Sequence, residues 1–125
     1  MGKVTNNFPK KTYFCLINLY AMKITIVSGA RPNFMKIAPI TRAIKAAQEA
    51  GKKISYRLIY TGRQDDTSLD ASLFSDLDMK RPDGYLGVTG HDHSEVAAAI
   101  MLAFEKELNN HPAQVVLVVD DLTAT

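Results

Sequence analysis

Residues 23–39 read Lys-Ile-Thr-Ile-Val-Ser-Gly-Ala-Arg-Pro-Asn-Phe-Met-Lys-Ile-Ala-Pro, and this stretch joins a strand pattern to a helix start. Residues 23–28 form a β-rich run that predicts a strand, and Gly29 ends that run. Pro32 favours a helix that begins there, because the first helical turn leaves its backbone N–H groups unpaired and proline has none to lose. The stretch therefore predicts a strand, a glycine turn and a helix N-terminus in direct succession.

Two cations, Arg31 and Lys36, stand at the start of this predicted helix. The first turn of a helix presents free backbone N–H groups and the positive end of the helix dipole, and both favour a bound anion. Together with the turn at Gly29, these features suit a phosphate or a carboxylate. We predict that Gly29, Arg31 and Lys36 bind substrate, with an ordinary solvated helix start as the alternative.

The composition predicts a globular chain. It has 125 residues, of which 46% are hydrophobic and 22% charged, so it is one domain or part of one. The formal net charge is +2, but three lysines (Lys3, Lys10 and Lys11) lie before Met22. Without them 12 basic residues (15 − 3) face 13 acidic ones, so we expect no nucleic-acid partner.

Residues 1–21 differ from the rest of the chain, and we interpret them as an upstream extension before Met22. Lysines precede a short apolar stretch, and this order loosely resembles a signal peptide. The alternatives to an upstream extension are therefore a true signal peptide or an extra ordered strand or helix. The stretch is too short to span a bilayer, so we expect no membrane partner. The single cysteine, Cys15, fits a reducing compartment, and we expect the protein in the cytoplasm.

The chain after residue 22 alternates strand and helix patterns. The expected strands are 24–28, 54–60, 85–88 (a short edge strand) and 115–119, and the expected helices are 34–50, 69–77 and about 93–108. This alternation predicts right-handed crossovers and a three-layer α/β fold with a parallel sheet, in which strand 115–119 is buried on both faces if it lies centrally. Ligands bind beyond the carboxyl ends of such strands, where Arg31, Arg63 and Asp121 follow.

Three segments resemble a known family. Gly29-Ala30-Arg31-Pro32 and Lys36-Ile37-Ala38-Pro39 are similar to the Gly-Thr-Arg-Pro-Glu…Lys-x-Ala-Pro signature of non-hydrolysing UDP-N-acetylglucosamine 2-epimerases. Thr61-Gly62 matches the next landmark, and 115–125 resembles the segment Val-Val-Leu-Val-x-Gly-Asp-Thr. The similar segments occur in the family's order between Met22 and Thr125.

The resemblance implies a fold, a reaction and a set of roles. Residues 22–125 would be the first half of a Rossmann-like N-terminal domain of a two-domain enzyme of the glycosyltransferase-B type. The family inverts C2 of a UDP-sugar, interconverting UDP-GlcNAc and UDP-ManNAc by eliminating and re-adding UDP, without a cofactor. Asp121 would be a catalytic acid/base, and Arg31 and Lys36 would hold the substrate. The family's other catalytic groups and its second domain would follow Thr125, so we expect this chain alone to be inactive.

The sequence departs from the family pattern at three places. Asn33 replaces the signature glutamate, Val119-Asp120 replaces a His-Gly pair, and Arg63-Gln64 begins a segment that replaces Gln-His-Arg. Asp120 therefore adds a second carboxylate beside Asp121, and carboxylates this close raise the pKa of one of them. These departures indicate a divergent branch of the family.

Three other features of the sequence allow different interpretations. His91 and His93 form a His-x-His pair, but zinc needs three or four ligands, so we expect a solvated loop and no metal site. Asp120-Asp121 after a strand is also found in response-regulator receivers, although there the pair lies near the N-terminus. A non-catalytic half-domain that binds a nucleotide sugar or serves assembly is a further alternative. We also expect a homo-oligomer, because an uncovered apolar strand invites pairing.

Overall fold

The computed structural model describes residues 21–125, so the predicted extension at 1–21 lies almost entirely outside the described part. The elements are β1 (Met22–Ser28), α2 (Arg31–Glu49), β2 (Ile54–Tyr60), α3 (Ala71–Asp76), β3 (Gly84–Tyr85), α4 (His93–Asn110) and β4 (Val115–Val118). The four strands form one sheet in the order β3-β2-β1-β4, and every pairing is parallel.

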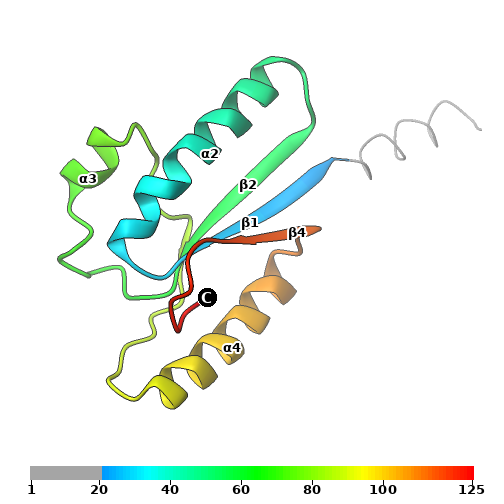
Figure 1. The fold of residues 1–125 in the computed structure, drawn as a ribbon. Helices are drawn as coiled ribbons and strands as arrows, with labels where there is room; N and C mark the ends of the chain where they lie inside the picture. Colours follow the sequence, from blue (N-terminus) through cyan, green and yellow to red (C-terminus); the bar gives the residue numbers. More distant parts are fainter. Residues whose placement is uncertain (1–20) are drawn as a thin grey trace, which may run out of the picture.

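The sheet has helices on both faces. Figure 1 shows α2 and α3 on one side and α4 on the other. A strand followed by a crossover helix and a parallel strand requires this arrangement, because each helix must bury its apolar side against the sheet. The predicted three-layer α/β fold with a parallel sheet is confirmed.

The core lies between α2 and strands β1 and β2. Ile26 and Leu58 extend from the two strands, and Phe34 and Ile37 extend from α2; all four are fully buried. The Phe34 ring meets the Phe74 ring edge-on, with centroids 5.2 Å apart, and this contact fastens α3 to the same core. The apolar residues of α2 are thus spaced so that they lie on the side of the helix that covers β1 and β2.

The register of the sheet brings the carboxyl ends of its strands together. Ser28, the last residue of β1, pairs with Tyr60, the last residue of β2. Val27 pairs with Val118 of β4 on the other side of β1. The loops that follow these strands therefore leave the sheet at one edge, and any site formed by those loops lies there.

Helix α4 begins where the sequence predicts. Asp92 caps it, because its carboxylate accepts hydrogen bonds from the backbone N–H groups of Ser94 (2.7 Å) and Glu95 (3.3 Å). An ion pair of 2.5 Å between Arg57 Nε and Glu107 Oε1 joins β2 to α4. No residue of α4 is fully buried, so this helix covers its face of the sheet only partly.

The remaining elements differ modestly from the predictions. The predicted helix 69–77 is shorter, because Asp70 caps α3 by accepting from the backbone N–H of Leu73 (2.9 Å). The predicted strand 85–88 pairs only at Gly84–Tyr85, at the edge of the sheet as expected. Strand β4 is not central among the described residues: it is an edge strand, and Val116 and Val118 are 42% and 47% exposed. The burial expected for a central position is therefore not observed.

None of the helices in residues 21–125 combines the length and the apolar character that crossing a membrane requires.

Replacing Phe34 by Ala should lower the free energy of unfolding by about 3–5 kcal/mol, because the change leaves a cavity in the core under α2. Urea denaturation followed by circular dichroism measures the loss. The neighbouring change Met35→Ala is the control, because Met35 is 65% exposed, and it should stay within about 0.5 kcal/mol of the parent. Equal effects of the two changes would contradict the assignment of this core.

Candidate functional site

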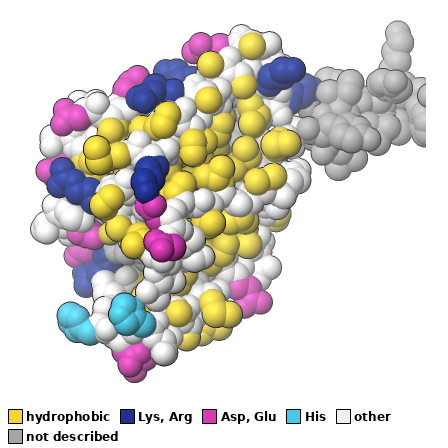
Figure 2. All heavy atoms as spheres, viewed as in Figure 1, with side chains coloured by type: hydrophobic (Ala, Val, Ile, Leu, Met, Phe, Trp, Pro, Cys, Tyr) yellow, Lys and Arg dark blue, Asp and Glu magenta, His cyan; other side chains and the backbone are white. Residues whose placement is uncertain are grey.

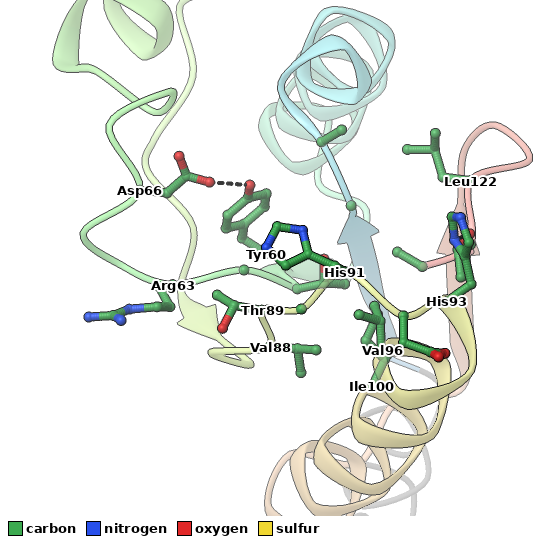
Figure 3. Close-up of a pocket in the computed structure, with 18 of the residues that line it drawn as sticks. Tyr60, Arg63, Asp66, Val88, Thr89, His91, His93, Val96, Ile100 and Leu122 are labelled. Atoms are coloured by element: carbon green, nitrogen blue, oxygen red, sulfur yellow. Dashed lines mark hydrogen bonds between the residues drawn. The ribbon is translucent and has the colours of Figure 1, made fainter.

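A pocket of about 630 Å³ lies beyond the carboxyl ends of the strands. Its walls come from the loops after β1, β2, β3 and β4 and from the first turns of α4 (Figure 3). Ligand pockets commonly measure about 300–1,000 Å³, so this one is large enough for a substrate. Its position is the one that the parallel fold predicts.

One wall of the pocket is held by Tyr60 and Asp66. The Tyr60 hydroxyl donates a 2.7 Å hydrogen bond to Asp66 Oδ2 (Figure 3), and the backbone N–H of Ser68 donates to Asp66 Oδ1 at 2.9 Å. Burial, followed by the bond to Asp66, raises the pKa of Tyr60 to about 12. The bond from Tyr60 lowers the pKa of Asp66, so a neutral phenol faces a carboxylate at neutral pH. This pair fixes the shape of the loop after β2.

Arg63 reaches out from the same loop. Its Nε and Nη2 atoms donate to the two oxygens of Asp65 at 2.8 and 2.7 Å, which makes a bidentate pair. Both side chains are more than half exposed. The charge of Arg63 is therefore compensated locally, and an anionic ligand would have to compete with Asp65 for it.

His91 and His93 lie on the side of the pocket formed by the start of α4. The ring nitrogen Nδ1 of His93 is 3.0 Å from Thr123 Oγ1, and this hydrogen bond links α4 to the loop after β4. His91 is drawn toward the pocket space in Figure 3. Within residues 21–125 no group of three His, Cys, Asp or Glu side chains is arranged to hold a metal ion. Both histidines line the pocket.

The turn between β1 and α2 is held by a buried asparagine. Asn33 Oδ1 accepts hydrogen bonds from the backbone N–H groups of Gly29 (2.8 Å) and Ala30 (3.0 Å), and the side chain is 1% exposed. These two N–H groups point toward the protein's own side chain. The predicted anion site at this turn therefore depends on the cations rather than on these backbone donors.

Asp120 joins the end of β4 to the same turn. Its Oδ2 accepts a 2.8 Å hydrogen bond from Asn33 Nδ2, and its Oδ1 forms an ion pair with Lys36 Nζ. The bond from Lys36 is the main cause that lowers the pKa of Asp120. Sequence reasoning did not assign Asp120 to the site. The signals in the sequence were its place beside Asp121 after a strand and its departure from the glycine of the family pattern.

The four site residues predicted from the sequence lie near the carboxyl ends of the strands, but their surroundings differ. Gly29 lines the pocket, whereas Arg31, Lys36 and Asp121 are exposed outside its lining. Lys36 is paired with Asp120. Arg31 forms no hydrogen bond or close ion pair with any residue of the described range, but its charge is a further cause, after the hydrogen bonds from Leu73 and Ser72, that lowers the pKa of Asp70. Their binding and catalytic roles remain predictions.

Gly29 is required for a steric reason. A Cβ atom added at Gly29 would lie 2.7 Å from the Cβ of Ala124 and 3.7 Å from the Cδ1 of Leu122. The loop after β4 therefore packs directly on the turn after β1. This close approach brings two strand ends, far apart in the sequence, into one wall of the pocket.

Four curated proteins are similar to this chain in sequence, and two of them illustrate the different enzyme names found among the four. A UDP-N-acetylglucosamine 2-epimerase from Methanocaldococcus jannaschii is 28% identical over 100 residues, which cover 80% of this chain and 26% of that protein. A UDP-2,3-diacetamido-2,3-dideoxy-D-glucuronate 2-epimerase from Pseudomonas aeruginosa is 28% identical over 104 residues, 83% of this chain and 28% of that protein. The chain thus spans about a quarter of the length of these relatives. No protein-family model matches the sequence.

Solved structures show the same fold. The M. jannaschii UDP-GlcNAc 2-epimerase in complex with UDP-GlcNAc and UDP matches with a TM-score of 0.68 and 27% identity, over 82% of this chain and 27% of that one. The Neisseria meningitidis UDP-GlcNAc 2-epimerase bound to UDP-GlcNAc matches with a TM-score of 0.69 over 83% of this chain; at 23% identity it supports the fold alone. The expected resemblance to the N-terminal part of such enzymes is confirmed for the fold.

Replacing Gly29 by Ala should lower the free energy of unfolding by about 1–3 kcal/mol, because the new methyl group clashes with Ala124. Urea denaturation measures the change. The double variant Gly29→Ala with Ala124→Gly should recover most of the loss, because it removes the atom that is struck. A double variant as unstable as Gly29→Ala alone would show that the loop after β4 does not pack on this turn.

Proposed function

We propose, on the premise that relatives in sequence and in structure point to the UDP-N-acetylglucosamine 2-epimerase family, that this chain binds a UDP-sugar and forms one wall of a 2-epimerase active site. The observation that carries the proposal is the pocket at the carboxyl edge of the sheet, with Arg31, Lys36 and Asp121 on the exposed surface at the same edge. The reaction would interconvert UDP-GlcNAc and UDP-ManNAc.

The chemistry of this edge supports a nucleotide-sugar ligand. A sugar and its nucleotide offer hydroxyl, amide and phosphate groups, and they need donors, acceptors and at least one cation. The pocket presents the imidazole of His91 and the hydroxyl of Thr89, and Arg31 lies beside it without an ion pair among the described residues. A guanidinium whose N–H groups have no close partner binds a phosphate through charge-assisted hydrogen bonds, so we assign the diphosphate to Arg31, with Asp70 as the carboxylate that its charge also reaches.

Asp121 is the proposed acid/base or sugar-positioning group. It follows β4 at the carboxyl edge of the sheet and is exposed, and the three residues after it, Leu122 to Ala124, line the pocket. A carboxylate near C2 of the sugar is the kind of group that moves a proton on and off that carbon. The proposed reaction eliminates UDP and adds it back after protonation on the other face of the sugar, and it uses no cofactor.

We propose that the chain by itself binds the ligand without turning it over. The proposed reaction needs several acid/base groups around one sugar, and Asp121 is the one described residue to which we assign such a role. The alternative function is a half-domain that binds nucleotide sugar or serves assembly and never takes part in catalysis. For the epimerase function we propose a cytoplasmic protein that supplies nucleotide sugars for polysaccharides of the cell envelope.

Isothermal titration should detect binding of UDP and of UDP-N-acetylglucosamine to the chain, and a coupled assay should find no release of UDP. Arg31→Ala should weaken UDP binding by about tenfold, the size of one charge-assisted contact. Lys45→Ala is the control, because it removes a cation from the same helix away from the pocket; it should change affinity by less than about twofold.

The absence of UDP binding at millimolar ligand would contradict the proposed function. Release of UDP by the chain alone would contradict the proposal that it is inactive by itself. Unchanged UDP affinity in Arg31→Ala would place the diphosphate elsewhere.

We also propose that the chain forms homo-oligomers through the β4 edge. Among the described strands β4 pairs only with β1, so its other side presents unpaired backbone groups. Val116, Val118 and Leu122 are exposed there, and Figure 2 shows hydrophobic side chains gathered over this edge. A second copy of β4 would satisfy both the backbone groups and the apolar surface.

Light scattering on a gel-filtration column should therefore show dimers or larger species. Val118→Lys should shift the protein toward the monomer, because a charged side chain on an edge strand opposes pairing. Met35→Lys places the same charge on an exposed apolar residue of α2 and should leave the oligomer unchanged. A monomeric parent protein at working concentration would contradict the proposal.

A further inference from the structure

We propose that Asp120 is a specificity-determining residue, because its carboxylate serves as a built-in counter-ion of Lys36 and leaves Arg31 as the cation that attracts an anionic ligand group. This inference rests on the proposed function only where it speaks of a UDP-sugar. The local charge arrangement stands without it.

The first observation is the contact itself. Asp120 receives a hydrogen bond from Asn33 Nδ2 at 2.8 Å and an ion pair from Lys36 Nζ, so each of its oxygens has a separate donor. The Asp120 side chain is 25% exposed, whereas that of Lys36 is 58% exposed. The Asp120 carboxylate accepts from both Lys36 and Asn33, so it occupies the position that an anion bound by these two side chains would take.

The second observation is the identity of Asn33. Its Oδ1 is used by two backbone N–H groups, and its Nδ2 is free to donate to Asp120. A glutamate at this position has no N–H to donate, and it would bring a second negative charge against Asp120. Two of the three places where this sequence departs from the epimerase pattern, Asn33 and Asp120, therefore contact each other and are chemically matched.

The third observation is the backbone of Asp120. Its φ angle is +66°, in the left-handed region that costs most side chains about 1–2 kcal/mol and that Gly, Asn and Asp tolerate best. The resembling segment of the family has glycine at this position, which would adopt this conformation without cost. The side chain at 120 is therefore not needed for the backbone conformation, and its contacts with Asn33 and Lys36 are what it adds.

The consequence concerns charge preference. Lys36 and Asp120 carry opposite charges in direct contact, so the formal charge of this pair is zero. A phosphate approaching Lys36 would have to displace or face Asp120, and like charges in close contact repel. Neutral hydroxyl and amide groups can bind beside the Lys36–Asp120 pair. The ammonium of Lys36 donates hydrogen bonds to them, and the carboxylate of Asp120 accepts hydrogen bonds from them. The sugar, rather than the diphosphate, would then lie nearest Lys36.

Isothermal titration with inorganic pyrophosphate tests the counter-ion role on the whole 125-residue chain. Asp120→Asn should bind pyrophosphate about tenfold more tightly than the parent, because Lys36 then lacks a counter-ion. Asp120→Gly should show the same gain, and both variants suit the left-handed backbone, so thermal unfolding should confirm that at least one is folded. Adding Lys36→Met to Asp120→Asn should abolish the gain.

Asp78→Asn is the matched control. Asp78 also has a positive φ, of 51°, and it follows α3 rather than β4, so the same loss of charge should leave pyrophosphate affinity unchanged. A folded Asp120 variant that binds pyrophosphate no more tightly than the parent would overturn the proposal. A gain that survives in the double variant with Lys36→Met would also overturn it.

A comparison of UDP with uridine separates this inference from the proposed function. If the pyrophosphate gain appears while neither uridine compound binds, the counter-ion role stands and the proposed function fails. If UDP binds the parent and Asp120→Asn gains nothing toward either UDP or pyrophosphate, the proposed function stands and the role of Asp120 fails.

Discussion

The site depends on the buried side chain of Asn33. Its carbonyl oxygen closes the turn between β1 and α2, and its amide reaches across to the end of β4. A buried polar group costs free energy unless its hydrogen bonds are made, so this side chain favours one arrangement of the three segments. Because the loop after β4 also packs on Gly29, hydrogen bonding and steric fit both fix the same corner.

Most of the fold could be predicted from local patterns. Strand β2 was predicted at its observed bounds, and the helices 34–50 and 93–108 differ from α2 and α4 by a few residues at their ends. The alternation of strand and helix patterns, together with the handedness of crossovers, leaves few topologies. The edge of the sheet where the site lies follows from the same argument, because parallel strands all end on one side.

The interactions that define the site could not be read from local patterns. Asn33 and Asp120 are separated by 87 residues, and their hydrogen bond requires two loops to meet at a specific angle. The family resemblance implicates Asp121, whereas the contact with Lys36 is made by the neighbouring Asp120. Which of two adjacent carboxylates faces inward depends on the backbone conformation at Asp120, and side-chain chemistry alone does not determine it. The exposure of β4 likewise depends on which segment packs beside it, and that neighbour cannot be predicted from the apolar sequence of β4.

The place of β1 in the sheet bears on how the chain reaches its folded form. Its backbone partners on one side come from β4, and the hydrogen bond between Lys23 and Gln114 joins residues 91 positions apart. Contacts of such long range form late, because the entropy of closing a long loop must be overcome first. During synthesis on a ribosome, β1, α2 and β2 emerge well before β4. The corner that joins Asn33 to Asp120 can therefore assemble only after the chain as far as Asp120 has left the exit tunnel.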